Sequence, residues 1–411
     1  MNRLSSHLFY GWIIVAFTFV LQFVSIGLAY YSLSVYLKPL SEALNADRFE
    51  VALAMSIQSI VVALLSPVAG RLYATRSIKL LLLTGTAAMA SGLLLLSQIT
   101  AVWQLYLLFG GVMGVGLVLL GVIPCNMLLA NWFHRRRGTA MGISQFGITI
   151  SATVLVPLVT WVLLQYGWET AFAVCGLGAL IVLTPLILTM AVRSPEERNL
   201  FPDGASEPPE ELVSDQDHDW TTLRAIKHRD VWALTLVVGP CYLGIAAVVL
   251  SLPSHITDIG ISAMDAAGVV AVTTLLGAIA KPLFGTLSDF FNKKLVLASS
   301  GALQFAGVSV LLVADDLTTL NIAGACFGLG YGGVATLWSV MLSVRFGRAA
   351  FAKVMGANMP MLLPFNIFGL PLAAYVYESA GSYLPAFTGL LGGYVVAWIA
   401  LALFRMEVPK D

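Results

Sequence analysis

One lysine lies deep inside an apolar stretch of the sequence. Lys281 is the only charged side chain well within the apolar run 266–287, where a cation is costly, so its presence indicates a functional site. The positions one and two helical turns away on the same side are Thr274, Gly277, Gly285 and Ser288. This small, polar face suits a protein contact or a water-filled cavity better than lipid. Lys281 is therefore a candidate ligand for a carboxylate; the alternative is a long side chain that reaches water at the membrane surface.

Four neutral polar residues in other apolar runs could complete such a site. They offer hydroxyl or amide groups and are Tyr31, Asn126, Tyr331 and Asn358. Polar side chains within membrane helices also bond to neighbouring helices, so a structural role is the alternative for each of them. The four cysteines lie in apolar runs without a Cys-x-x-Cys pair, which indicates buried thiols and supports no metal site, disulfide or cofactor.

Twelve apolar runs must position these residues. Of the 411 residues, 58% are hydrophobic and 11% charged, a composition that predicts lipid around most of the chain. Each run is long enough to cross a membrane as a helix of about 20 residues. The expected spans are 11–37, 51–69, 80–99, 103–131, 139–165, 171–192, 231–252, 266–287, 295–314, 319–343, 354–378 and 385–404. The first run is too long for the core of a cleavable signal and is predicted to be an uncleaved span.

The basic residues predict the orientation, because cytoplasmic loops of membrane proteins collect Lys and Arg. With the amino terminus inside, 19 of the 22 Lys and Arg fall on the cytoplasmic side, and only Lys38 and Arg48 fall outside. We therefore expect both termini in the cytoplasm and a multi-pass protein of the cell membrane. The formal net charge of zero gives no case for a nucleic-acid partner.

A hydrophilic segment divides the chain into two halves. We expect a six-helix bundle over 1–192, a cytoplasmic linker over 193–230 and a second six-helix bundle over 231–411. Short motifs recur 214 or 215 positions apart, such as Met-Gly at 141–142 and again at 355–356, which indicates a parallel repeat. Residues 199–219 are rich in Pro, Glu and Asp, and we predict that they are loosely packed.

Two motifs carry a family resemblance. Residues 285–294 read Gly-Thr-Leu-Ser-Asp-Phe-Phe-Asn-Lys-Lys, and residues 132–142 read Trp-Phe-His-Arg-Arg-Arg-Gly-Thr-Ala-Met-Gly. The first resembles the G-x-L-x-D-x-x-G-K/R-K/R signature of the major facilitator superfamily. The second resembles the W/Y-F-x-R-R-R-G-x-A-x-G block of monocarboxylate transporters and oxalate/formate exchangers. Residues 10–12 and 255–260 also fit that group, so the resemblance covers nearly the whole chain.

This resemblance implies a fold and roles for individual residues. The fold would be all-α, with twelve transmembrane helices in two six-helix bundles and both termini cytoplasmic. Gly285 and Asp289 would belong to a cytoplasmic latch, together with Arg137; the copy of the signature in the first half has Ala74 where Asp is expected. Lys281, followed by proline, stands where the family has an arginine that binds the substrate carboxylate. Lysine keeps the charge but lacks the two-pronged guanidinium.

The sequence also departs from its relatives. Gly277 stands where animal monocarboxylate transporters have an aspartate, and Tyr31 aligns with their helix-1 lysine; both family residues are implicated in proton coupling. Oxalate exchangers hold a dianion between two cations, the second in helix 11, whereas residues 354–378 contain no Lys or Arg. One fixed cation suits one carboxylate.

These observations favour a secondary active transporter of a small organic anion, with a monocarboxylate preferred, that works by alternating access and is not an enzyme. A dicarboxylate/formate-type anion exchanger is the alternative in the same class, and a non-transporting membrane solute sensor is the alternative in a different class. The expected partners are a small carboxylate, the lipid bilayer and either a proton or a counter-anion. We expect a monomer.

Overall fold

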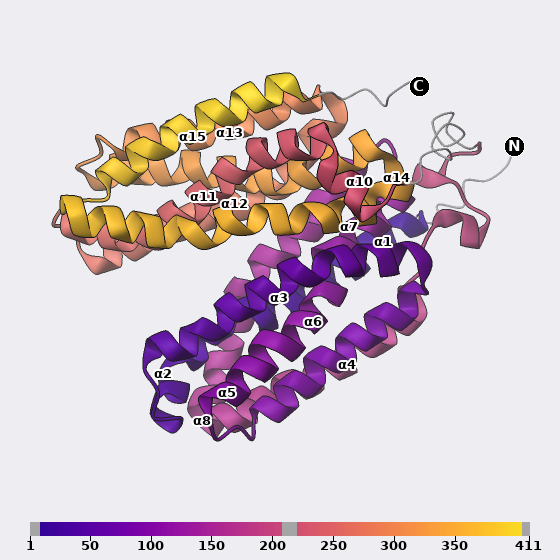
Figure 1. Ribbon diagram of the computed structural model, residues 1–411, viewed down its shortest axis with the longest axis horizontal. Helices are drawn as coiled ribbons and strands as arrows, with labels where there is room; N and C mark the ends of the chain where they lie inside the picture. Colours follow the sequence, from indigo (N-terminus) through magenta and orange to yellow (C-terminus); the bar gives the residue numbers. More distant parts are fainter. Residues whose placement is uncertain (1–8, 208–219, 405–411) are drawn as a thin grey trace, which may run out of the picture. The chain divides into compact units, whose positions relative to one another are not determined.

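The computed structural model describes residues 9–207 and 220–404, which fold into helices joined by short connections (Figure 1). The first half contains α1 (Tyr10–Ile26), the π-helical turn η1 (Gly27–Tyr31), α2 (Leu33–Ala43), α3 (Arg48–Thr75), α4 (Ile78–Leu96), α5 (Val102–Leu105), the π-helical η2 (Tyr106–Val112), α6 (Met113–Leu120), α7 (Val122–Trp132) and α8 (Arg137–Met190). The short 3-10 helices η3 (Pro195–Arg198) and η4 (Pro202–Gly204) follow. The second half contains α10 (Thr222–Lys227), α11 (Arg229–Asp258), α12 (Ala263–Phe290), α13 (Lys293–Leu311), α14 (Leu317–Ala380) and α15 (Leu384–Leu403).

Ten helical stretches in the described chain are long and apolar enough to cross a membrane. Two of them, α8 and α14, contain 54 and 64 residues, or about 80 and 95 Å of helix, whereas the hydrocarbon core is about 30 Å thick. Each is interrupted by a glycine with positive φ, Gly167 at 84° in α8 and Gly347 at 70° in α14. Only glycine adopts such a conformation readily, so neither stretch is one continuous helix.

Contacts between helices divide the chain into two compact units, described separately below. Unit 1 comprises Met1–Leu65 and Leu72–Asp219, and unit 2 comprises Ser66–Arg71 and Trp220–Asp411. Within unit 1, α1 packs on α8, and α4 packs on both α6 and α8. Within unit 2, α14 packs on α11, α12 and α13, and α15 packs on α11 (Figure 1).

The helix bounds repeat between the two halves. Both ends of α12 lie 215 positions after the corresponding ends of α3, and the same shift relates α13 to α4. The starts of α3 and α12 are stabilised in the same way, because a side chain at the third position of each helix bonds with the residue before the helix. These pairs are Asp47 with Glu50 and, 215 positions later, Ser262 with Asp265. The repeat found in the sequence therefore extends to the helix termini.

Equivalent glycines allow close helix packing in each unit. A Cβ atom at Gly328 of α14 would lie 2.2 Å from the carbonyl oxygen of Thr273 in α12. At Gly114 of α6, 214 positions earlier, a Cβ atom would lie 2.9 Å from Cγ1 of Val61 in α3. Small residues of this kind let the backbones of membrane helices approach each other, and here they bring α12 against the first part of α14.

The start of the linker is ordered. The carboxylate of Asp203 accepts hydrogen bonds from the backbone N–H groups of His134, at 2.8 Å, and Arg135, at 2.7 Å. These groups lie just before α8, where an anion also interacts favourably with the helix dipole. The prediction of loose packing is therefore wrong at Asp203, whereas residues 204–207 are exposed and residues 208–219 lie outside the described residues.

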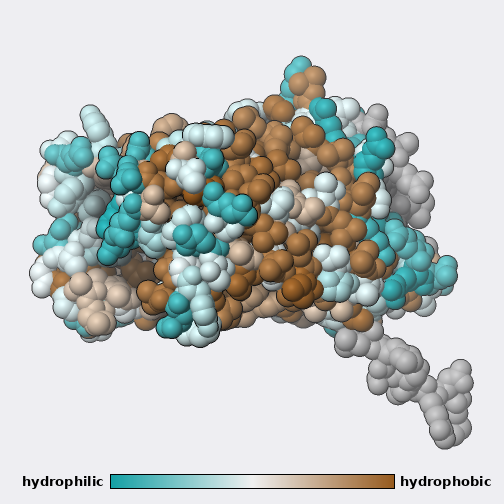
Figure 2. Space-filling view, turned by 90° about the horizontal axis from the view of Figure 1, so that it is seen from below, coloured by the Kyte–Doolittle hydropathy of each residue, from teal (hydrophilic) through white to brown (hydrophobic). Residues whose placement is uncertain are grey.

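The surface has the pattern of a membrane protein. On the face shown in Figure 2, hydrophobic residues cover the middle and hydrophilic residues gather toward both ends. Large apolar side chains are exposed in several helices, for example Leu164 at 74% and Ile181 at 71%. Lipid is the solvent that such a surface requires, so the chain is a multi-pass protein of the cell membrane, as expected from its composition.

Candidate substrate site

The sequence gives α12 two different faces. Leu275, Ile279 and Leu283 are exposed and apolar, and each is separated from the next by one helical turn. Lys281 lies on the other side of the helix and is only 5% exposed, so protein and not lipid surrounds it. The buried face also includes Gly277, consistent with the predicted protein contact. Burial of an ammonium is costly, and a carboxylate ligand would compensate for it.

Tyr331 of α14 covers this face one turn before Lys281. A Cβ atom at Gly277 would lie 2.1 Å from Cζ of the Tyr331 ring, and the hydroxyl of Tyr331 lies 3.4 Å from the carbonyl oxygen of Thr274. The structure thus places the Tyr331 ring of α14 against the face of α12 that carries Lys281, one helical turn before this lysine. It also explains the missing aspartate: a side chain at position 277 would occupy the space that the tyrosine ring fills.

Asn358 takes part in a buried network within unit 2. Its Nδ2 donates to Oγ1 of Thr235 in α11 at 2.7 Å, and its Oδ1 accepts from Nε1 of Trp338 at 2.7 Å. All three residues are at most 4% exposed. Contact between the Asn358 amide and a substrate would therefore compete with one of these bonds, which are of the interhelical kind named as the alternative for this residue.

Tyr31 lies in the π-helical turn η1 of unit 1. In this turn the N–H of Ser32 bonds to the carbonyl oxygen of Gly27 at 3.2 Å, which widens the helix by one residue. The rings of Tyr30 and Tyr31 meet edge to face, with centroids 5.6 Å apart. Turns of this kind occur often at functional sites because they re-aim side chains, which is consistent with a site role for Tyr31.

Unit 1 also contains buried polar side chains in α1, α7 and α8. Asn126 of α7 is fully buried, as its chemistry and depth suggested. The sequence analysis missed Gln22, whose Nε2 donates to Oγ of Ser144 at 2.6 Å. Within the described chain, no hydrogen-bond partner lies near Oε1 of Gln22. The available signal was a glutamine near the middle of an apolar run, a position similar to that of the predicted asparagines.

The expected latch residues lie near helix ends. Gly285 is buried and Asp289 half-buried in the last turns of α12. Arg137 is 7% exposed, and its Nε donates to the carbonyl oxygen of Phe133 at 2.6 Å, so this guanidinium secures the turn before α8. A latch formed by these residues stays a prediction.

The sequence analysis treated Arg345 only as a basic residue that indicates orientation. In the structure its Nη2 lies 2.5 Å from Oδ2 of Asp230, and both side chains are at most 5% exposed. Trp220 and His228 pack around the neighbouring Phe346, with ring centroids 5.0 to 5.5 Å apart. Burial lowers the pKa of His228, although the charge of Asp230 opposes this effect. This cluster attaches the second end of the linker to unit 2.

The described residues contain no group of His, Cys, Asp and Glu arranged to hold a metal ion. All four cysteines are free thiols. In unit 2, the arrangement therefore consists of one buried cation and a neighbouring phenol, with a separate amide network. In chemical terms this arrangement can bind an anion.

Repeated helical halves, an apolar surface and a buried cation define the class, a polytopic membrane transporter. The family model described as the Major Facilitator Superfamily matches residues 15–365 and 234–411, and the chain belongs to this superfamily. This result confirms the resemblance found in the sequence motifs. Among curated proteins, the chain is similar to monocarboxylate transporters.

The chain is 24% identical to monocarboxylate transporter 2 of Homo sapiens over 399 residues, which cover 91% of this chain and 81% of the relative. It is also 24% identical to monocarboxylate transporter 13 of Rattus norvegicus, with 94% and 87% covered. Among solved structures, the superfamily transporter FucP in its outward conformation aligns with a TM-score of 0.72 at 16% identity, covering 97% of this chain and all of FucP. The proton:xylose symporter XylE aligns with a TM-score of 0.67 at 17% identity, covering 96% of this chain and 94% of XylE. These two structures support the fold.

Proposed function

We propose that this protein is a secondary transporter that moves a small monocarboxylate across the cell membrane by alternating access. The observation that carries the proposal is the burial of Lys281, an ammonium in the middle of an apolar helix that is only 5% exposed. A fixed cation in a low-dielectric environment selects anions and disfavours lipophilic cations. The names of the monocarboxylate transporter relatives agree with this substrate class.

Within this proposal the Lys281 ammonium binds the substrate carboxylate. The hydroxyl of Tyr331 donates a second hydrogen bond after it exchanges its bond to the Thr274 carbonyl for one to the substrate. Tyr31 and Asn126 are further candidate donors in unit 1. Asn358 contributes by holding Trp338 and Thr235 in place, or directly if one of its bonds opens on binding. Asp289, Gly285 and Arg137 are the proposed latch.

The membrane topology belongs to the same proposal. Division of α8 at Gly167 and of α14 at Gly347 turns the ten apolar stretches into twelve crossings. Both termini and the linker 193–230 would then lie in the cytoplasm, between bundles 1–192 and 231–411. Single cysteines introduced at Arg135, on a background without the four native cysteines, test this arrangement. We expect labelling by a membrane-impermeant maleimide only after the cytoplasmic side is opened.

A dicarboxylate exchanger would need a second cation for its second carboxylate. The eleventh expected span, residues 354–378, contains no Lys or Arg, so a monocarboxylate is the favoured substrate. The protein is reconstituted into liposomes, and uptake of radiolabelled acetate, L-lactate and pyruvate is compared with uptake of oxalate and succinate. We expect uptake of at least one monocarboxylate, whereas preference for the dianions would establish the exchanger.

The same liposomes distinguish the coupling modes and the sensor. An imposed inward proton gradient accelerates uptake by a proton symporter, and preloading with unlabelled substrate accelerates uptake by an exchanger. Binding of a carboxylate without uptake under either condition would contradict transport and favour a non-transporting sensor. Empty liposomes supply the background.

A further inference from the structure

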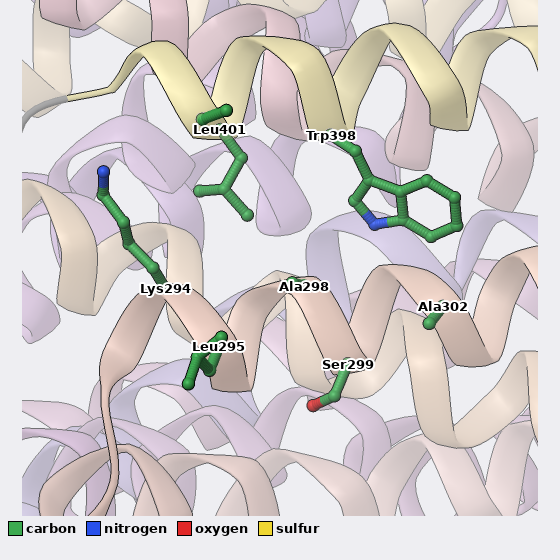
Figure 3. A pocket seen from close by; sticks show the side chains of 8 residues that line it. Lys294, Leu295, Ala298, Ser299, Ala302, Trp398 and Leu401 are labelled. Carbon is green, nitrogen blue, oxygen red and sulfur yellow. The ribbon is translucent and has the colours of Figure 1, made fainter.

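An apolar groove runs along the outside of unit 2 between α13 and α15 (Figure 3). Its volume is about 520 Å³, and it is lined by Lys294, Leu295, Ala298, Ser299, Ala302, Trp398, Leu401 and Ala402. Ala298 and Ala302 have small side chains one turn apart on α13, which leaves a trough beside the indole of Trp398. Both helices are membrane-spanning stretches, so the open side of the trough faces hydrocarbon.

One end of the groove is basic. The side chain of Lys294 reaches from the start of α13 toward the end of α15 (Figure 3), where its ammonium donates a hydrogen bond to the carbonyl oxygen of Phe404. Arg229, at the start of α11, donates to the neighbouring carbonyl oxygen of Leu403 at 3.4 Å. Lys293 precedes Lys294 at the amino terminus of α13, where the helix dipole adds partial positive charge. Lys294 and Arg229 thus both bond to backbone carbonyls. The Lys294 ammonium has three N–H donors, so it can bind an anion in addition to the Phe404 carbonyl.

We propose that this groove binds one anionic phospholipid, with an acyl chain along Ala298, Ala302 and Trp398 and the headgroup phosphate at Lys294. An apolar trough with positive charge at its interfacial end complements a lipid in shape and charge. Each basic residue near a bilayer surface contributes about 1 kcal/mol to attraction of anionic lipid. The inference depends on the membrane location of the chain and not on its substrate.

Unit 1 provides a matched control. Lys79 stands 215 positions before Lys294, at the same place in α4, and its ammonium donates to the carbonyl oxygen of Leu188 at 2.9 Å. Lys79 therefore makes the same kind of helix-end bond but does not line the groove. Lys79→Gln therefore removes a bond of this kind, to the Leu188 carbonyl, and leaves the residues that line the groove unchanged.

The experiment titrates the detergent-purified protein with dioleoyl phosphatidylglycerol or dioleoyl phosphatidylcholine and counts retained lipids by native mass spectrometry. We expect one phosphatidylglycerol to be retained at least about fivefold more strongly than phosphatidylcholine, since about 1 kcal/mol corresponds to a factor of five. Lys294→Gln should abolish this preference, whereas Lys79→Gln should preserve it. Ala302→Leu fills the trough without touching either lysine and should reduce retention of both lipids at this site.

Equal retention of the two lipids by the parent would overturn the proposal, as would an unchanged preference in Lys294→Gln. Unchanged retention in Ala302→Leu would also overturn it, because the acyl chain would then lie elsewhere. If Ala302→Leu instead dissociates a dimer of the parent, a second copy of the chain and not a lipid occupies the groove, and the proposal fails.

Discussion

In unit 1, Gln22 donates to Ser144, and in unit 2, Asn358 donates to Thr235. Ser144 and Asn358 are 214 positions apart, so both halves use an amide-to-hydroxyl bond between equivalent pairs of spans, with donor and acceptor exchanged. Only unit 2 adds a third partner, Trp338, which occupies the remaining amide oxygen. Both halves thus contain the bond between helices. The amide oxygen of Gln22 can accept a further hydrogen bond, whereas that of Asn358 already accepts one from Trp338.

A similar contrast separates α12 from α3, its counterpart 215 positions earlier. Lys281 of α12 stands 215 positions after Ser66 of α3, and each is followed by proline. Gln304 of α13 likewise stands 215 positions after Met89, and its buried amide has no hydrogen-bond partner in the described chain. The helix bounds are repeated, but the first half has no cation at position 66 and no amide at position 89. We infer that the two halves share their helix arrangement and differ in the polar and charged side chains that the helices carry.

The largest expected difference between the units concerns the two ends of the linker. Asp230→Ala leaves the buried guanidinium of Arg345 without its carboxylate, which should cost about 3–5 kcal/mol of unfolding free energy. Asp203→Ala removes hydrogen bonds to the backbone of His134 and Arg135 and should cost about 1.5–3 kcal/mol. Chemical unfolding in mixed micelles measures both values. Asp230→Leu combined with Arg345→Met should recover most of the loss, and equal costs for the two single variants would break the comparison.

A smaller difference should separate two equivalent glycines. In Gly328→Ala the new methyl group meets the backbone of Thr273, which cannot rotate away, so we expect a loss of about 1–3 kcal/mol. In Gly114→Ala it meets the end of the Val61 side chain, which can shift, so the loss should be smaller. Melting temperatures of the two purified variants test this order. A larger drop for Gly114→Ala would contradict the packing described for α12 and α14.

The smallest difference should come from the amide-to-hydroxyl bonds. Asn358→Ala leaves the Trp338 indole and the Thr235 hydroxyl without that partner, at a cost of about 2 kcal/mol. Ser144→Ala removes one acceptor from Gln22, at a cost of about 1 kcal/mol. Thermal unfolding measures the cost, and tryptophan fluorescence of Asn358→Ala should report the changed environment of Trp338. If the two variants lose similar amounts of stability and the fluorescence does not change, the bond from Trp338 to Asn358 does not stabilise unit 2.

The sequence predicted the helical membrane fold and the repeat because apolar runs and motif spacing are local signals. It also identified Lys281, since a charge within such a run is visible without a structure. It did not reveal the bond between Asp230 and Arg345, because pairing between residues 115 positions apart depends on tertiary packing. For the same reason it left open whether Asn358 binds a substrate or neighbouring helices, and in the structure two neighbours use its amide.

The central claim is that the Lys281 ammonium binds the substrate carboxylate. The measurement is calorimetric affinity of the parent, Lys281→Ala, Lys281→Gln and Lys281→Arg for the monocarboxylate taken up by the liposomes. Lys38→Gln is the control, because this lysine is 72% exposed. A charge-assisted hydrogen bond is worth about 1.5–3 kcal/mol, so Lys281→Ala and Lys281→Gln should bind about 10- to 150-fold more weakly, while Lys281→Arg keeps part of the affinity. If folded Lys281→Ala and Lys281→Gln both bind within about twofold of the parent, Lys281 does not hold the substrate and the account is wrong.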